Sequence, residues 1–461
     1  MTPDLPARMP PPARAHALPR PPAPPGAGWA AARRILCLRL DNLGDVLMTT
    51  PALHALRHAL PGRELTLLTS RAAALAAPHL DDVVEVIAHD APWVAGTGDA
   101  AADLALLARL AGRRFDAAVI FTVYSQSPLP AALLCRLAGI PLVLAHCREN
   151  PGALLSDWLP EPEPEMLLRH EARRQLDLVA HVAPPLPEGR AQRLRFALRD
   201  TDRAEAVTLL AVLGLPPDAR FVLAHPGATA ASRRYAPADL GVALAGIARA
   251  TGLRVLIGGS AGERGLAAEV EVAARRALAI ADTGGASAVV PVSASATPAA
   301  VVLSDAARPG RSPRVRNIAG RLSLGGAAAL MARARLLVSN NSAPVHLAAA
   351  LGVPVVDLYA LTNPQHTPWQ VPHRLLFSDQ PCRHCYRSVC TARRRACLDD
   401  ITPADITAAA LDLLAEAAGP SSAVPRAAPP PARPDPLPLV TGPRRALAQP
   451  GSGSPGDPPP C

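Results

Sequence analysis

The sequence predicts an α/β fold made of two doubly wound domains that face each other across a central cleft. Short apolar runs alternate with helical patterns in two successive series. A stretch rich in Pro, Glu and Arg, residues 183–204, separates the two series. Apolar strands that alternate with helices are typical of parallel sheets covered on both faces. Each series therefore predicts one parallel sheet.

Five strands are expected in each series. Those of the first are 35–40, 65–69, 83–87, 117–121 and 142–145, and those of the second are 221–225, 255–258, 336–339, 355–359 and 375–378. The helical patterns between them lie at 46–59, 103–111, 237–250, 262–276, 323–334 and 344–351. Ligands of such sheets bind outside the carboxyl ends of the strands, so the loops that follow the strands are the places to look for a site.

Prolines concentrate at the two ends of the chain, with ten of the 53 in residues 1–25 and fourteen in residues 420–461. Such segments have too little apolar surface to form a core. Residues 1–28 and 419–461 are therefore predicted to be disordered tails.

The folded part divides at the stretch between the two series. An N-terminal domain is predicted over 29–190 and a C-terminal domain over 205–418. Within the second domain, residues 281–313 are rich in Ala, Ser, Gly and Thr and show no firm period. This segment is predicted to be a mobile insertion.

The net charge of +9 comes entirely from arginine, because the chain has no lysine. This modest excess suits an anionic ligand or an anionic membrane surface. No strip of aromatic and basic residues accompanies it, which argues against a nucleic-acid partner. Proline interrupts the N-terminus and no long apolar run follows, so neither a secretory signal nor a membrane span is expected. A cytoplasmic location with reduced cysteines is predicted.

The first strand leads into a carboxylate-bearing turn, LDNLGD at 40–45. The turn lacks the glycine pattern of a dinucleotide site and the lysine of a phosphate-binding P-loop. What remains is Asp45 at the carboxyl end of a strand, where a helix begins. The alternative interpretation is a helix cap, because Asp at a helix start accepts backbone N–H bonds.

Two loops of the second series have the composition of anion sites. HPGATAASRRY at 225–235 combines small residues, which admit a phosphate to the backbone, with Arg233 and Arg234. GGSAGE at 258–263 places Glu263 where it could bind a ribose or base. The alternatives are a solvated turn for the first loop and a helix-capping glutamate for the second.

A third loop, SNNSAPVHLAAALG at 339–352, begins a helix at the end of a strand. Ser342 suits the N-cap, Pro344 the first turn and Gly352 the C-cap. A helix N-terminus that points into a cleft favours phosphate. His346 follows in the first turn, although a single histidine there is more often structural.

Taken together, these motifs resemble glycosyltransferase family 9, the ADP-heptose:lipopolysaccharide heptosyltransferases, over roughly residues 33–415. The match is carried by 40–53, by HPGAT at 225–229, by 340–352, and by the cysteine-bearing segment 381–403. The resemblance implies the GT-B fold of two Rossmann-like domains. It also implies an inverting transfer from a nucleotide-diphosphate sugar such as ADP-heptose to a lipopolysaccharide-core or other lipid-linked glycan, with no cofactor required for catalysis, at the inner face of the cytoplasmic membrane.

The family's functional residues fall on matching positions of this chain. Its base falls on Asp45 and the preceding basic residue on Arg39. Its donor-binding residues fall on Thr229, Arg233, Glu263, Asn341, Ser342, Ala343 and His346. Arginine stands at 233 where the family has lysine, and can hold a diphosphate through two donors. Asn341 and Ala343 replace the family's Asp and Gly, which leaves the identity of the donor sugar open.

Four cysteines, Cys382, Cys385, Cys390 and Cys397, lie within sixteen residues and include a CxxC pair. One interpretation is a structural zinc site with four thiolate ligands. The alternatives are a reduced loop or a redox-sensitive pair. Cys37, Cys135 and Cys147 lie on apolar segments and are expected in the core.

Three functions from different classes fit the sequence. The first is the glycosyl transfer just described, with heptose or another sugar. The second is a family member that binds a nucleotide sugar without turnover, suggested by Asn341 and Ala343. The third is another GT-B enzyme, such as a sugar-nucleotide epimerase, for which the sequence offers no further acid–base pair.

Overall fold

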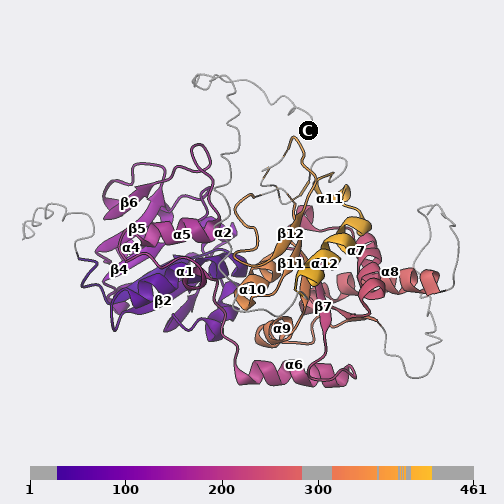
Figure 1. The fold of residues 1–461 in the computed structure, drawn as a ribbon. Helices are drawn as coiled ribbons and strands as arrows, with labels where there is room; N and C mark the ends of the chain where they lie inside the picture. The colour runs from indigo at the N-terminus through magenta and orange to yellow at the C-terminus, as the bar shows by residue number, and fades with distance from the viewer. Residues whose placement is uncertain are drawn as a thin grey trace, which may run out of the picture.

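The computed structural model describes residues 28–282, 314–360, 363–382, 385, 387, 389, 390 and 396–417. In these residues the chain forms two six-stranded sheets in which every neighbouring pair of strands is parallel. Helices cover both faces of each sheet, and the two sheets lie side by side (Figure 1). The predicted α/β fold is confirmed. The predicted tails lie outside the described residues apart from Gly28, and the predicted insertion does so apart from 281 and 282.

The first sheet has β1 at its centre and the strand order β3-β2-β1-β4-β5-β6. Its strands are β1 (Arg34–Arg39), β2 (Glu64–Thr69), β3 (Glu85–Ala88), β4 (Ala117–Ile120), β5 (Leu142–Cys147) and β6 (Asp157–Pro160). Its helices are α1 (Leu43–His58), α2 (Pro92–Ala95), α3 (Ala100–Arg113), α4 (Leu129–Leu137) and α5 (Glu171–Val179), with short 3₁₀ turns η1 (Ala73–His79), η2 (Gly152–Leu154) and η3 (Arg190–Gln192).

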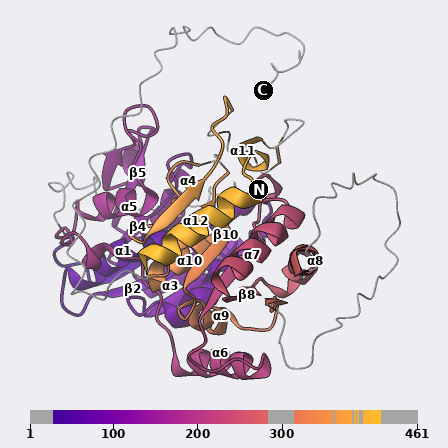
Figure 2. The ribbon, with the colours of Figure 1, turned by 45° about the vertical axis from the view of Figure 1, so that its right-hand side comes forward.

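The second sheet repeats this order as β9-β8-β7-β10-β11-β12. Its strands are β7 (Phe221–His225), β8 (Arg254–Ile257), β9 (Val315–Asn317), β10 (Leu336–Asn340), β11 (Val355–Leu358) and β12 (His373–Leu376). Its helices are α6 (Asp200–Val212), α7 (Pro237–Thr251), α8 (Arg264–Asp282), α9 (Leu324–Met331), α10 (Ala343–Leu351), α11 (Ala396–Asp399) and α12 (Pro403–Glu416), with 3₁₀ turns η4 (Ala231–Arg233) and η5 (Ala261–Glu263). Figure 2 shows α12 and α7 side by side, and the two helices are in contact.

The side chains of β1 point alternately to the two faces of its sheet, and both faces are covered by helices. This explains why the apolar run of β1 is continuous. Ile35 and Cys37 belong to the apolar cluster that contains α1 and α5 residues. Leu36 and Leu38 belong to the opposite cluster, with residues of α3 and α4. Successive side chains of a strand point to opposite faces, so a strand covered on both sides needs apolar residues at every position. Cys37, Cys135 and Cys147 are buried in these clusters, as predicted.

The two halves share apolar packing. Met48 of α1, Ala172 of α5, Leu194 and Ala349 of α10 form one small buried cluster, against which Trp369 packs. Leu194 lies in the segment that connects the two sheets. The connecting stretch was predicted at 183–204. Its last five residues belong to α6, which begins at Asp200 and packs on α9.

All ten predicted strands are present within two residues at either end. Two short edge strands, β6 and β9, were not predicted, and neither were α4, α5, α6 and α12. Among the described residues, no helix is long and apolar enough to span a membrane.

Candidate active site

Asp45 lies in the first turn of α1, directly beyond the carboxyl end of β1. Asn42 is the N-cap of this helix and Asp45 is its third residue, so the helix-capping alternative is confirmed in part: Asp45 caps the helix from the third position. Asp45 Oδ2 accepts the backbone N–H of Asn42 at 3.1 Å, which closes a capping box from the third helical position. Its Oδ1 accepts from Arg39 at 3.1 Å, and the side chain remains 12% exposed. The carboxylate is therefore fixed at both oxygens without being sealed from solvent.

Arg39 is fully buried among three carboxylates. Its guanidinium lies 3.1 Å from Asp41, 3.1 Å from Asp45 and 2.7 Å from Glu171. Burial lowers the pKa of Arg39, but Asp41, Glu171 and Asp45 raise it above its ordinary value. A buried charge needs such partners, so Arg39 is a permanent cation that orients the carboxylate of Asp45.

Glu171, the first residue of α5, supports Arg39 from the other side. Burial raises its pKa, but the charges of Arg39 and Arg174 outweigh burial and lower the pKa to about 2. Gln175 also donates to Glu171 Oε1 at 2.6 Å. Sequence reasoning missed Glu171 because its helix is polar. The positions of these residues in the sequence do not indicate that several carboxylates surround one buried arginine.

The second half approaches Asp45 through His346 and His366. A Cβ added at Gly44 would lie 2.8 Å from Cδ2 of His346, so α1 and α10 meet at a position that only glycine fits. His366 Nε2 lies 4.0 Å from Asp45 Oδ1. Burial lowers the pKa of His366 to about 4, and burial also lowers the pKa of His346 well below its ordinary value. Both imidazoles are neutral at pH 7.

His366 was also missed by sequence reasoning, although a signal for it exists. It belongs to the polar segment 363–367, which follows the predicted strand that became β11. Loops after parallel strands lie at the ligand-binding edge of the sheet. The segment is tied to the first half, because the backbone N–H of Glu171 donates to the carbonyl of Gln365 at 3.0 Å.

The loops after β7 and β10 lie next to each other, as their strands do. The amide of Asn340 donates to the carbonyl of Pro226, and its oxygen accepts the backbone N–H of Tyr235 at 3.0 Å. Ser342, the N-cap of α10, donates to the carbonyl of Gly227 at 3.3 Å. Beside these contacts Thr229 is exposed, and Ala343 is the first residue of α10.

Arg233 is half-buried in η4, and among the described residues nothing accepts a hydrogen bond from its Nε. Its charge contributes to lowering the pKa of both His346 and His366. The guanidinium of Arg233 is therefore close enough to both histidines to act on them electrostatically. A guanidinium with an unused buried donor is suited to an anionic ligand.

Glu263 is the last residue of η5, which follows β8, and packs over Gly227, whose added Cβ would collide with the Glu263 carboxylate. Its Oε2 accepts from the backbone and hydroxyl of Ser260 at 2.7 and 2.8 Å. The helix-capping contact expected in the alternative interpretation is thus present. It leaves Glu263 beside the HPG loop, where a nucleoside role stays a prediction.

Asn341 is turned toward β11. Its amide donates to Asp357 at 2.9 Å and to the carbonyl of His366 at 2.8 Å. Asp357 is fully buried, and burial raises its pKa to about 8 although the hydrogen bond from Asn341 lowers it. The chain has an amide at position 341, where the family has a carboxylate. The nearest carboxyl group is that of Asp357, on the neighbouring strand β11, which accepts from this amide.

The predicted site residues do not all converge. Asp45, Arg39, Arg233 and His346 lie around one place with Asn341 and Ser342 at its edge, and Glu263 lies farther along the second sheet. The four C-terminal cysteines form no group of three converging ligand atoms among the described residues. The zinc interpretation of these cysteines stays a prediction.

Comparison with known proteins agrees with the predicted resemblance. The model of "Glycosyltransferase family 9 (heptosyltransferase)" matches residues 276–395. Lipopolysaccharide heptosyltransferase 1 of Pseudomonas aeruginosa is 43% identical over 72 residues, which are 15% of this chain and 20% of that relative. The chain thus matches about a fifth of the length of this relative.

Two solved structures show the same fold. An ADP-heptose lipopolysaccharide heptosyltransferase II of E. coli has 20% identity and a TM-score of 0.59, covering 84% of this chain and 99% of that one. A glycosyltransferase family 9 protein of Veillonella parvula has 18% identity and a TM-score of 0.59, covering 83% and 97%. The predicted GT-B architecture is confirmed.

Proposed function

We propose that this chain is a family 9 glycosyltransferase that transfers a heptose from ADP-heptose to a lipopolysaccharide-core acceptor, with inversion at the anomeric carbon and no metal ion in the transfer step. The observation that carries the proposal is Asp45. It is a partly exposed carboxylate fixed by Arg39 at the carboxyl edge of one sheet, and His366 from the other half lies 4.0 Å from it.

Asp45 acts as the general base. The acceptor hydroxyl loses its proton to the Asp45 carboxylate while its oxygen forms a bond to the anomeric carbon of the donor. The bond between that carbon and the diphosphate oxygen breaks on the opposite face, which inverts the centre. A positioned base of this kind accelerates a reaction by about 10²–10⁴-fold.

The leaving diphosphate gains negative charge as the bond breaks. Arg233, with its unused Nε, and the backbone N–H groups at the start of α10 supply opposite charge there. Donors that are already aimed at developing charge contribute a large share of catalysis. Neutral His346 and His366 add no cation that would compete with Arg233 for the phosphates.

The acceptor is a lipid-linked glycan, and the chain works at the cytoplasmic face of an anionic membrane. The net charge of +9, carried by arginine alone, supports attraction to such a surface.

The test is Asp45→Asn in the full chain, measured by heptose transfer from ADP-heptose to a heptose-free lipopolysaccharide core. We expect transfer to fall about 10³-fold while ADP binding measured by calorimetry is retained. The matched control is Asp405→Asn, because Asp405 closes the same capping box on α12. It should leave transfer unchanged.

Two outcomes would contradict the proposal. Equal rates in Asp45→Asn and the unmodified chain would remove Asp45 from the reaction. Binding of ADP-heptose by the unmodified chain, with neither transfer nor hydrolysis, would indicate a nucleotide-sugar-binding protein. A parallel screen with other nucleotide sugars determines which donor the site around Asn341 accepts.

A further inference from the structure

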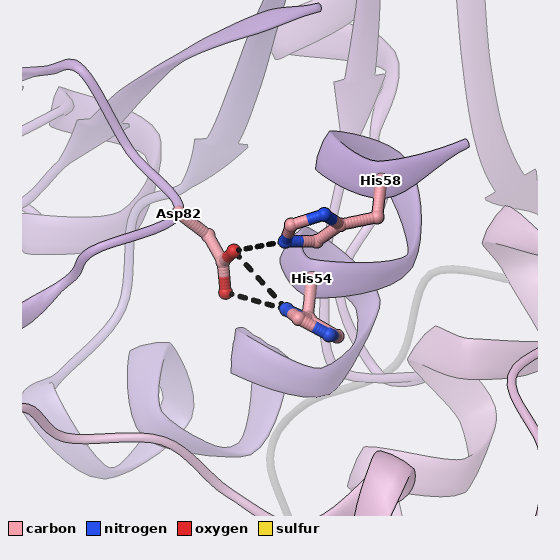
Figure 3. A group of neighbouring side chains, drawn as sticks. All are labelled: His54, His58 and Asp82. Carbon is pink, nitrogen blue, oxygen red and sulfur yellow. Dashed lines mark hydrogen bonds and ion pairs between the residues drawn. The ribbon is translucent and has the colours of Figure 1, made fainter. Parts of the chain in front are cut away.

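A second polar cluster lies on α1, away from Asp45. It consists of His54, His58 and Asp82, whose side chains point toward one another (Figure 3). His54 Nδ1 lies 3.1 Å from both carboxylate oxygens of Asp82, and His58 Nε2 lies 3.1 Å from Oδ1. One potential ligand atom of each residue lies within 4.8 Å of the other two. Among the described residues, no other group of three or more shows this convergence.

The local sequence explains the arrangement. His54 and His58 are four residues apart on α1, and such residues share one face of a helix. Asp82 lies in the turn between η1 and β3, and η1 packs against α1. The carboxylate is thereby held over the helix face that carries both imidazoles.

The distances suit a metal ion as well as hydrogen bonds. Two ligand atoms at 2.0–2.1 Å from a tetrahedral ion lie about 3.3–3.4 Å apart. The N–O distances here are 3.1 Å, so an ion requires these pairs to move apart by a few tenths of an ångström, and the two nitrogens, which lie within 4.8 Å of each other, to come to the same separation. Burial lowers the pKa of His54, with Asp82 opposing and Arg195 and His58 adding to the effect. A neutral imidazole is the form that binds a metal.

The cluster also has an access route. His54 and Asp82 line a cavity of about 490 Å³ together with Arg190, Arg193 and Arg195 from the segment that connects the two sheets. An ion with three protein ligands keeps one open position. The arginines favour an anionic group, such as a phosphate or carboxylate oxygen, in that position.

We propose that His54 Nδ1, His58 Nε2 and the Asp82 carboxylate form a binding site for a divalent ion of the zinc class, with its fourth position open to the arginine-lined cavity. Two imidazoles and one carboxylate are a ligand set that such ions accept. The site is separate from the transfer reaction. His54 follows Asp45 by nine residues, a rise of about 14 Å along the helix.

The experiment is equilibrium dialysis of the full chain against Zn²⁺, followed by metal analysis. We expect His58→Ala and Asp82→Asn each to lose one bound ion per chain, or to weaken its binding by at least about 100-fold, because loss of a direct ligand costs more than loss of an outer partner. His181→Ala is the matched control, since His181 is an exposed histidine elsewhere on the surface. It should bind as the unmodified chain does.

The design separates this site from the four C-terminal cysteines, which stay intact in every variant. His58 is 59% exposed, so its replacement by Ala leaves the fold in place, and thermal unfolding without metal checks this. Zn²⁺ should raise the melting temperature of the unmodified chain more than that of His58→Ala. Equal ion content and equal affinity in these two proteins would overturn the proposal and leave only a histidine–aspartate hydrogen-bond cluster.

Discussion

Asp357 and Asn341 form a buried carboxyl–amide pair at the edge of the candidate site. Because burial raises the pKa of Asp357 from an ordinary 3.8 to about 8, the folded chain holds a proton that the unfolded chain releases. The stability that this proton contributes is complete below pH 3.8 and is lost as the pH rises through 8.

We therefore predict that Asp357→Asn removes a pH dependence from the free energy of unfolding. Between pH 5 and pH 8 the unmodified chain should lose up to about 4 kcal/mol through this one group, at about 1.4 kcal/mol per pKa unit. The variant should lose correspondingly less. Urea unfolding of both proteins at the two pH values measures the difference, and parallel curves would contradict the assignment.

A substitution of Asn341, the other member of the pair, tests the same assignment. Asn341→Asp replaces the amide donor that lies 2.9 Å from Asp357 with a second carboxylate, and should destabilise the chain most at pH 8. Combining it with Asp357→Asn restores one amide and one carboxylate in exchanged positions. That double variant should recover part of the loss, although the carbonyl of His366 still lacks the donor it has now.

At the scale of residues, sequence reasoning found the groups that stand in motifs and missed those that depend on packing. Asp45 and Arg233 lie shortly after the ends of strands and were predicted from that position, whereas Arg39, the last residue of β1, was assigned through the family resemblance. Glu171 comes from a helix far along the chain and meets Arg39 only in the folded protein. The contact between Glu171 and Arg39 arises because α5 packs on α1, and no sequence motif indicates it.

At the scale of elements, α1 contains a proline that its helical pattern alone would not explain. Pro51 cannot donate to the carbonyl of Leu47. The hydroxyl of Thr50 donates to that carbonyl instead, at 2.6 Å. The sequence Thr-Thr-Pro therefore compensates for its own missing hydrogen bond, and the helix continues from Asp45 to His58.

The contact between α1 and α10 gives a prediction at this scale. Gly44→Ala places a methyl group about 2.8 Å from His346, which forces the two helices apart. We expect a loss of about 1–3 kcal/mol in stability. A shift of about 1 Å between reacting groups can cost on the order of 100-fold in rate, so kcat/KM for heptose transfer should fall by up to that factor.

Gly112→Ala in α3 is the matched control, because a Cβ at Gly112 meets no atom within 4 Å. It should leave kcat/KM unchanged and stabilise the helix slightly. Full activity in Gly44→Ala would show that the approach of α10 to α1 is not needed for transfer.

The elements that escaped prediction share physical reasons. β6 and β9 are edge strands of four and three residues, and β6 ends in proline, so neither has a readable period. α5 buries Glu171, Arg174 and Gln175 on its inner side. The same buried side also carries Ala172, Leu176, Leu178 and Val179, and an apolar pattern does not identify the polar residues that are buried among them through ion pairs.

At the scale of the whole molecule, the two halves are held together around Trp369. Its indole N–H donates to the carbonyl of Gln192 at 2.7 Å, and its ring lies 4.4 Å from the ring of His170. It also packs against the small cluster formed by Met48, Ala172, Leu194 and Ala349. The residue thus connects the second half to both the first half and the segment between them.

Trp369→Ala should loosen this arrangement without unfolding either sheet. We expect the free energy of unfolding to fall by about 2–3 kcal/mol, somewhat less than for a fully buried tryptophan, and the radius of gyration from solution X-ray scattering to increase. Trp158→Ala on β6 is the control, since Trp158 is 41% exposed. An unchanged radius in Trp369→Ala would mean that other contacts fix the two halves.

The identical strand order of the two sheets has a consequence for the candidate site. Each half has its own complete sheet, and the residues of the candidate site are divided between the two halves. Asn341 and Asp357 both belong to the second half, whereas Asp45, Arg39 and Glu171 belong to the first. Under the proposed function, substitutions at Asn341 and Asp357 can therefore change the contacts to the donor without replacing any residue that orients Asp45.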